Sequence, residues 1–179
     1  MSSGRLLGIC GSLRAGSLNR KLLMEAKAAF DPATFDDADL RFPLYDGDLE
    51  SRDGIPEAVQ TLSDQIAQAD AVVIASPEYN KSISGALKNA LDWVSRTEGN
   101  PWGDKPLAIM SATAGRAGGE RGQLMMRESL VAFRPRLVTG PEVLVGAAQD
   151  QFEGEVLTNE INRKALNGLM DALRTAAGL

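Results

Sequence analysis

The chain has 179 residues, enough for one domain with a sizeable buried core, and we expect a single domain over residues 1–179. It contains one cysteine, Cys10, which we expect in the core, and no histidine. These counts exclude Ser-His-Asp and Cys-His catalysis, His-ligated zinc sites and intramolecular disulfides. If the protein is an enzyme, we expect its chemistry to come from a group that the chain binds.

The overall charge is acidic. With 19 Lys and Arg against 24 Asp and Glu, the net charge is -5 and the isoelectric point is about 4.8. Nucleic-acid binding needs a basic face, which this balance disfavours. No apolar run approaches the roughly 20 residues of a membrane span, and the MSSGR start is unlike a signal peptide. We therefore expect a cytoplasmic protein that binds neither nucleic acid nor membrane.

The first half of the chain alternates between strand and helix patterns. Residues 5–10 form an apolar run that predicts a buried strand, and apolar residues at helical spacing predict a helix over residues 18–30. Residues 39–42 alternate weakly and predict a short second strand. Residues 43–56 (PLYDGDLESRDGIP) are so rich in turn-forming residues that we expect a loop without regular structure.

The second half continues this alternation. Pro56 suits the first position of a helix, and residues 71–76 (AVVIAS) are typical of a central parallel strand. Further strands are predicted at residues 106–111 and 143–145, with a glycine-rich loop over residues 114–122. Three more helices are predicted from apolar residues at helical spacing: Ile83, Leu87, Ala90, Leu91 and Val94; Leu124, Leu130, Val131 and Phe133; and Ile161, Ala165, Leu169 and Leu173.

Five strands separated by helices predict an α/β fold in which a parallel sheet is covered on both faces. Right-handed crossovers restrict such sheets to a few doubly wound topologies. Ligands of these folds bind beyond the carboxyl ends of the strands, where the strand order reverses. The loops after the first, third and fourth predicted strands are therefore the candidate site.

The loop after the first strand, GSLRAGSLN at residues 11–19, contains the parts of a phosphate site. Ser12 and Ser17 supply hydroxyl groups, Arg14 supplies a cation, and Asn19 opens a helix whose N-terminal amides favour an anion. The loop matches neither GxGxxG nor GxxxxGK[ST], which favours a terminal phosphomonoester as the ligand. The alternative is an ordinary turn with Ser17 as N-cap.

The loop after the third strand, SPEYNKSISG, has residues suited to a flat heterocycle. Pro77 fixes the backbone, Tyr79 offers an aromatic plane, and residues 78–80 can present backbone amides. The alternative is a turn in which Ser82 or Ser84 caps the next helix.

The loop after the fourth strand, SATAGRAGGERG, is rich in glycine, which lets a backbone approach a bound ring. Arg116 or Arg121 can meet an anionic partner there. The alternative is a flexible surface loop.

Taken in order, GSLRAGSLN, SPEYNKSISGALKNALDW and SATAGRAGGERGQ resemble the NADPH-dependent FMN reductase family, and PLYDGDLE and FEGEVLTNE extend the resemblance. It implies a flavodoxin-like three-layer sandwich whose five-stranded parallel sheet has the order 2-1-3-4-5. It also implies that bound FMN carries the chemistry, with no catalytic side chain. The implied FMN-binding residues are Ser12, Arg14, Ser17 and Asn19 at the phosphate, Pro77, Glu78, Tyr79 and Asn80 along the isoalloxazine, and Ser111, Thr113 and Gly115 at its pyrimidine end.

The activity that this resemblance implies is an NAD(P)H oxidoreductase. Electrons would pass from NADH or NADPH through FMN to a small acceptor such as a quinone, an azo dye, chromate, a ferric complex or free flavin. The alternatives are a flavodoxin-type electron carrier and a flavin-free binding module of the same fold. Arg14 and the moderate net charge favour the reductase.

The family also implies a homodimer or a tetramer. Where quinone and chromate reductases often have Tyr-His-Leu-Arg, this chain has residues 124–127, Leu-Met-Met-Arg, which weakens the case for a tetramer. These apolar side chains suit a dimer face, and the alternative is that Met125 and Met126 fill the chain's own core. Trp93 and Trp102 are expected at or near such an interface, with a core position as the alternative for Trp93.

Overall fold

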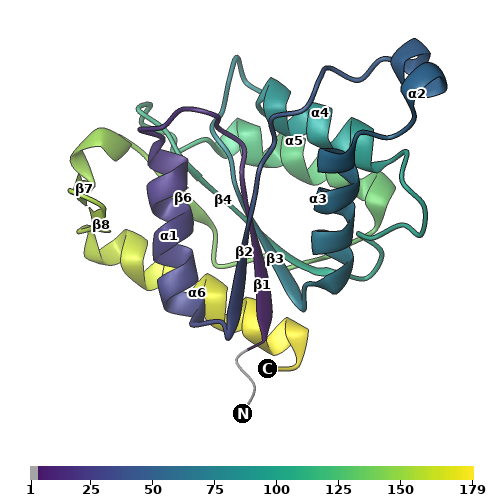
Figure 1. The fold of residues 1–179 in the computed structure, drawn as a ribbon. Helices are drawn as coiled ribbons and strands as arrows, with labels where there is room; N and C mark the ends of the chain where they lie inside the picture. The colour runs from purple at the N-terminus through teal and green to yellow at the C-terminus, as the bar shows by residue number, and fades with distance from the viewer. Residues whose placement is uncertain (1–3) are drawn as a thin grey trace.

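The computed structural model describes residues 4–179, so the first three residues of the MSSGR start lie outside it. A parallel sheet with the order β2-β1-β3-β4-β5 lies between two layers of helices (Figure 1). This confirms the predicted strand order. The strands of this sheet are β1 (Arg5–Cys10), β2 (Thr34–Ala38), β3 (Ala71–Ala75), β4 (Pro106–Ala112), β5 (Arg136–Leu137) and β6 (Val143–Val145), the last of which also pairs with β4.

The helices are α1 (Leu18–Phe30), α2 (Gly47–Asp53), α3 (Glu57–Gln68), α4 (Gly85–Val94), α5 (Glu120–Leu130) and α6 (Glu160–Ala177). Side chains of the central strands alternate between two cores. In β3, Val72 and Ile74 pack with α3, α4 and α5, whereas Val73 packs with α1 and α6 on the other face. No helix within residues 4–179 has the length and apolar character needed to cross a membrane.

The place of the fifth strand is shared by two short segments. β5 pairs with Pro106 and Leu107 at the start of β4, whereas β6 pairs with residues 110–112 at its end. The predicted strand at residues 143–145 is β6, and β5 was not predicted because two residues carry no periodicity. β6 therefore supports the end of β4 from which the glycine-rich loop emerges.

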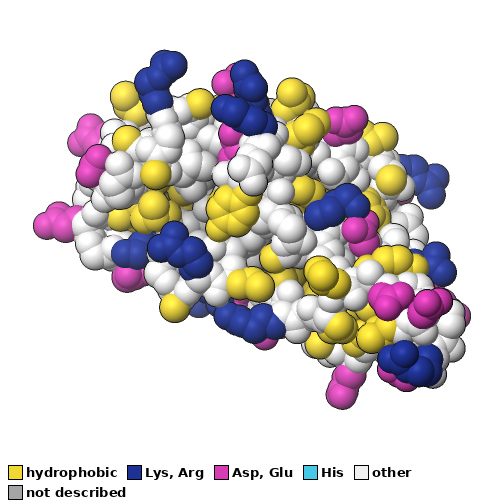
Figure 2. Space-filling model, turned by 90° about the horizontal axis from the view of Figure 1, so that it is seen from above, with side chains coloured by type: hydrophobic (Ala, Val, Ile, Leu, Met, Phe, Trp, Pro, Cys, Tyr) yellow, Lys and Arg dark blue, Asp and Glu magenta, His cyan; other side chains and the backbone are white. Residues whose placement is uncertain are grey.

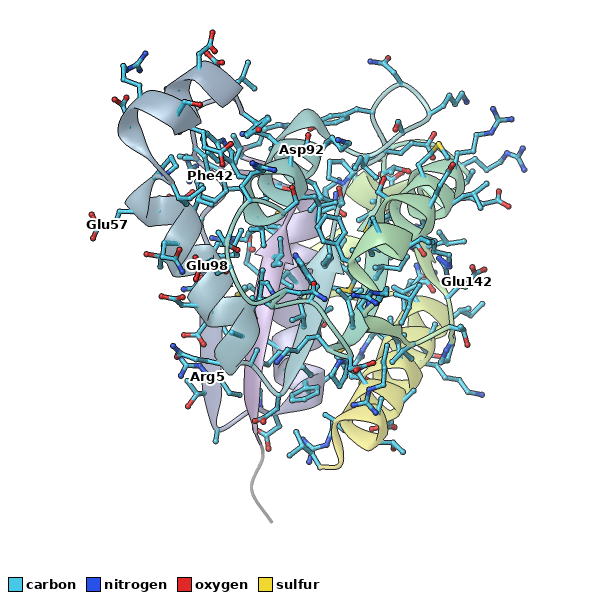
Figure 3. The ribbon with its side chains drawn as sticks, turned by 90° about the vertical axis from the view of Figure 1, so that its right-hand side faces the viewer. Arg5, Phe42, Glu57, Asp92, Glu98 and Glu142 are labelled. Carbon is cyan, nitrogen blue, oxygen red and sulfur yellow. The ribbon has the colours of Figure 1, made fainter. Side chains whose placement is uncertain are left out.

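The second strand lies at Thr34–Ala38, so the prediction of a strand at residues 39–42 is wrong. Its sequence TFDDA looks too acidic for a sheet, but it is an edge strand whose carboxylates have partners. Asp36 pairs with Arg5 of β1, with 2.5 Å between Oδ2 and Nε, and Asp37 pairs with Arg20 of α1. Figure 3 shows Arg5 at the end of the molecule opposite to Phe42, which follows β2.

The segment predicted to lack regular structure contains a helix, α2, so that part of the prediction is wrong. The Asp46 side chain caps α2 by accepting a hydrogen bond from the Asp48 amide at 2.9 Å. None of its residues is buried, and Figure 1 shows it projecting from the body of the molecule. A seven-residue helix without an apolar face cannot be recognised by periodicity.

Contacts with α4 hold the α2 segment in place. The Trp93 indole donates to the Pro43 carbonyl at 2.8 Å, and the Tyr45 ring packs edge-on against Trp93 with 5.0 Å between ring centroids. Arg96 forms an ion pair with Glu50 at 3.1 Å. These partners lie far apart in sequence, which explains why local patterns did not reveal α2.

The two tryptophans are buried in the core of the chain itself. Trp93 is fully buried and Trp102 is 2% exposed, so the core alternative for Trp93 holds. That the two residues lie at or near a subunit interface stays a prediction. Met126 is also buried, and Met125 packs partly against the same core.

Some apolar residues that were predicted to face the core point to solvent. Leu124 is 63% exposed and Ile161 is 80% exposed. Val131 is 73% exposed because α5 ends at Leu130 and a 3-10 turn, η1 (Val131–Phe133), follows.

Candidate functional site

The loops after β1, β3 and β4 meet at the carboxyl ends of the strands and enclose a cleft of about 360 Å³. Figure 2 looks onto this face, where hydrophobic side chains occupy the middle and Lys and Arg side chains lie around them. All the predicted site residues except Asn80 and Ser111 line the cleft. Its lining is Ser12, Arg14, Gly16, Ser17, Leu18, Asn19, Pro77, Glu78, Tyr79, Ala112, Thr113, Ala114 and Gly115.

The first loop begins where β1 passes very close to β3. The Gly11 amide donates to the Ala75 carbonyl at 2.8 Å, and the Ser84 hydroxyl donates to the Gly11 carbonyl at 2.5 Å. A Cβ atom at Gly11 would lie 2.8 Å from the Cβ of Ser76, so only glycine fits there without movement. This close approach fixes the start of the loop relative to the β3 loop.

The N-terminus of α1 faces the cleft. Ser17 is buried and accepts a hydrogen bond from the Arg20 amide at 3.3 Å, which confirms that it is the N-cap. The amides of Leu18 and Asn19 have no hydrogen-bond partner within residues 4–179. The two unpaired amides and the helix dipole favour an anion at this position.

The side chain of Asn19 is occupied by the backbone of β4. Its Nδ2 donates to the Ala112 carbonyl at 2.8 Å, and its Oδ1 accepts from the Ala112 amide at 2.9 Å. Asn19 is only 3% exposed. The side chain therefore holds the first and third loops together. Of the groups of Asn19, the backbone amide is free to bind a phosphate, and that contact stays a prediction.

The second loop contains a tight turn. Tyr79 and Ser82 exchange two backbone hydrogen bonds of 3.0 and 3.1 Å, and Asn80 and Lys81 between them both have positive φ, 52° and 69°. The Tyr79 side chain is 46% exposed at the cleft, whereas Asn80 lies outside its lining. Ser84 caps α4 by accepting from the Leu87 amide at 3.2 Å, as the alternative predicted.

Glu78 connects the second loop to α5. Its Oε2 accepts a hydrogen bond from the Gly122 amide at 3.0 Å, in the first turn of a helix whose N-cap, Gly119, offers no side chain. A Cβ atom at Gly122 would lie 3.0 Å from the Cβ of Glu78, so the two segments are in close contact. One carboxylate oxygen of Glu78 thus has a structural partner, and its predicted contact with the flavin stays a prediction.

The third loop is held by side chains in its interior. The Ser111 hydroxyl donates to the Gly118 carbonyl at 2.6 Å and accepts from Gln123 Nε2 at 2.9 Å. Gly119 has φ 93°, and a Cβ atom there would lie 2.7 Å from Ser111 Oγ. Ser111 therefore shapes the loop from inside, and its predicted contact with the flavin stays a prediction. Sequence reasoning missed Gln123, which shows no signal beyond its place in GGERGQ.

Backbone hydrogen bonds also join the third loop to the segment after β6. The Thr113 amide donates to the Val145 carbonyl at 3.0 Å, and the Thr113 carbonyl accepts from the Ala148 amide at 2.9 Å. The amides of Ala114 and Gly115 have no partner in the part of the chain that the structure describes. Two available donors therefore lie on a loop that backbone hydrogen bonds join to the segment after β6.

Several cations near the cleft have no counter-ion. Arg14, Arg116 and Arg121 form no ion pair with a described residue, whereas Arg20 and Arg41 are paired with Asp37 and Asp39. Of these three, Arg14 lines the cleft, so on a chain of net charge -5 it is the cation that an anionic ligand in the cleft can meet.

Cys10 ends β1 beside the first loop and is 4% exposed, as expected for a core residue. Burial raises the pKa of its thiol. The folded state therefore keeps the proton more tightly than the unfolded state, and the resulting stabilisation is present below about pH 8.5 and is lost as the pH rises further.

We predict that iodoacetamide at pH 8 labels Cys10 only after unfolding in urea, because the native thiol is buried and protonated. The FMN binding and reductase activity that the resemblance implies should stay within about twofold in Cys10→Ser, since the buried sulfur fills space in the core. Mass spectrometry measures the labelling, and rapid labelling of the native protein would contradict the prediction.

Comparisons with known proteins agree with this geometry. The family model described as NADPH-dependent FMN reductase matches residues 5–150. The chain belongs to that family. It is therefore an oxidoreductase of a family that uses FMN and NAD(P)H, which favours the predicted reductase over the carrier and the flavin-free module.

Individual relatives support the same assignment. An NAD(P)H-dependent FMN reductase of Pseudomonas aeruginosa is 42% identical over 153 residues, which cover 84% of this chain and 82% of that protein. A quinone reductase of Escherichia coli is 39% identical over 161 residues, covering 86% and 85% of the two chains. The structure of FerB, a flavoenzyme NAD(P)H:(acceptor) oxidoreductase from Paracoccus denitrificans, has a TM-score of 0.87 at 30% identity and covers 98% and 97%. The flavodoxin-like fold is thereby confirmed.

Proposed function

We propose that this protein binds FMN in the cleft and uses it to pass electrons from NAD(P)H to a small acceptor, with quinones as the first choice. The observation that carries this proposal is one cleft that is lined by unpaired amides from the loops after β1 and β4 and by the unpaired Arg14. Bound FMN supplies the electron-transfer chemistry, so the residues need only bind, orient and shield it.

The donor set fits the two ends of FMN. The Leu18 and Asn19 amides and the unpaired Arg14 suit a phosphate dianion at the N-terminus of α1. At the other end, the Ala114 and Gly115 amides suit the carbonyl oxygens and nitrogens at the edge of a flavin ring. Donors held there also stabilise negative charge on that edge.

The ring would lie along the second loop. Pro77 and Tyr79 line the cleft between the two donor groups, so an aromatic face and a rigid backbone are present where a flat ring needs them. With Tyr79 about half exposed, the cleft stays open to a second flat molecule. Nicotinamide and quinone rings both have that shape.

Relatives named quinone reductase and NAD(P)H:quinone oxidoreductase support the quinone as acceptor. We propose chromate, azo dyes, ferric complexes and free flavin as further electron acceptors. We also propose that residues 1–179 act as one domain in a cytoplasmic homodimer or tetramer. The exposed Leu124 and Val131 support contact between copies.

Anaerobic stopped-flow spectroscopy of the purified protein tests the function. We expect a yellow protein with flavin absorbance that bleaches rapidly on mixing with NADPH or NADH and recovers on adding a quinone. Slow bleaching would point to an electron carrier. A colourless protein that takes up no FMN would refute the proposal.

A further inference from the structure

A second hollow of about 450 Å³ adjoins the cleft on the side of the third loop. Ala114 lines both spaces, so a ligand in the cleft can continue past it into the hollow. Apart from Ala114, none of the proposed FMN contacts lines this second space. Its lining is Ala114, Arg116, Gly146, Ala147, Asn159, Ile161 and Asn162.

The floor of the hollow is fixed before any ligand arrives. The Ala147 amide donates to the Gly115 carbonyl at 3.1 Å. A Cβ atom at Gly146 would lie 2.9 Å from the carbonyl carbon of Arg116, so the two backbones are in close contact. A preformed site loses less free energy on binding because fewer groups must become ordered.

The chemistry of the lining suits a nucleoside with a phosphate. Arg116 is exposed and has no acidic partner within residues 4–179, and a guanidinium group binds phosphate well. Asn159 uses its Oδ1 to accept from the Asn162 amide at 3.1 Å, which leaves its NH₂ group for a ligand. Ile161, 80% exposed, offers an apolar surface to a purine ring.

Arg116 differs from the other cations on this face because it lines the hollow. Lys81 and Arg121 line neither the cleft nor the hollow, and Arg14 lies on the phosphate loop. Glu160 is the acid nearest in sequence to the hollow's lining, but it does not form part of that lining. Among the residues that line the hollow, Arg116 is thus the one with a charged side chain.

We propose that this hollow binds the adenosine end of the nicotinamide dinucleotide, that Arg116 binds its 2′-phosphate, and that the protein consequently prefers NADPH to NADH. This inference rests on the proposed function, because it places the nicotinamide end of the same molecule in the cleft. The 2′-phosphate is the one group that distinguishes the two dinucleotides, so one cation on the path of the ligand is sufficient for selectivity.

Isothermal titration of the FMN-loaded protein with adenosine 2′,5′-bisphosphate and with adenosine 5′-monophosphate tests the site. A charge-assisted contact predicts that the bisphosphate binds about tenfold more tightly or better. Arg116→Ala should remove most of this difference and leave the monophosphate affinity within about twofold, whereas Arg116→Lys should keep part of it. Arg121→Ala should change neither affinity and serves as the matched control, because Arg121 is an exposed arginine in the first turn of α5 that lines neither space.

Kinetics separate this inference from the proposed function. The ratio of kcat/KM for NADPH to that for NADH should fall about tenfold in Arg116→Ala, with the FMN content unchanged. An unchanged ratio, or equal loss of both adenosine affinities, would overturn the Arg116 site while leaving the reductase intact. Failure of both dinucleotides to reduce the wild-type flavin would overturn the function and the inference together.

Discussion

Arg14→Ala is expected to weaken FMN binding about 10- to 100-fold while the fold stays intact, because a charge-assisted contact with phosphate contributes about 1.5–3 kcal/mol. Arg14 is exposed and has no ion-pair partner among the described residues, so its removal breaks no contact between elements of the fold. Flavin fluorescence titration measures the affinity, and circular dichroism checks the fold.

Arg163→Ala is the matched control for this experiment. Arg163 is an exposed residue of α6 and does not line the cleft, so the same loss of charge should leave the FMN affinity unchanged. An Arg14→Ala protein that leaves gel filtration fully yellow would show that Arg14 does not bind the phosphate.

Asn19→Leu should lower the free energy of unfolding by about 2–5 kcal/mol, because it leaves the buried amide and carbonyl of Ala112 without partners. For a chain of this size, such a loss lowers Tm by roughly 2–4 °C for each kcal/mol. The substitution should also weaken FMN binding, since Asn19 holds the phosphate loop against the third loop. Urea titration and thermal scans measure the stability.

Asn167→Leu provides the comparison on α6. Asn167 is exposed and makes no hydrogen bond through its side chain within the described part of the chain, so we expect a change within about 0.5 kcal/mol. If Asn19→Leu were equally mild, the two hydrogen bonds to Ala112 would not be holding the loops together.

The central strands could be predicted from the sequence because they are covered on both faces. β1, β3 and β4 are continuous apolar runs, and the predicted boundaries of each lie within one residue of those observed. β2 could not be predicted in this way. Its acidic residues are tolerated only because Arg5 and Arg20 approach them from other elements.

The site could be located by residue type, but the roles of its side chains could not be assigned that way. Ser12, Arg14 and Tyr79 were placed on the cleft by the loop in which they occur. By contrast, Asn19 and Glu78 bind backbone groups 93 and 44 residues away in the sequence. Such partners emerge only when the strands align, which local patterns do not encode.

The exposed helix α2 has a consequence for local stability. It buries no residue, and its ion pair between Glu50 and Arg96 lies at the surface, where salt screens it. Segments of this kind open at a far lower free energy than the sheet does. The amide protons of α2 should thus exchange with solvent through local opening, and their exchange rate should rise with ionic strength. The amide protons of β3 should exchange only when the whole molecule unfolds.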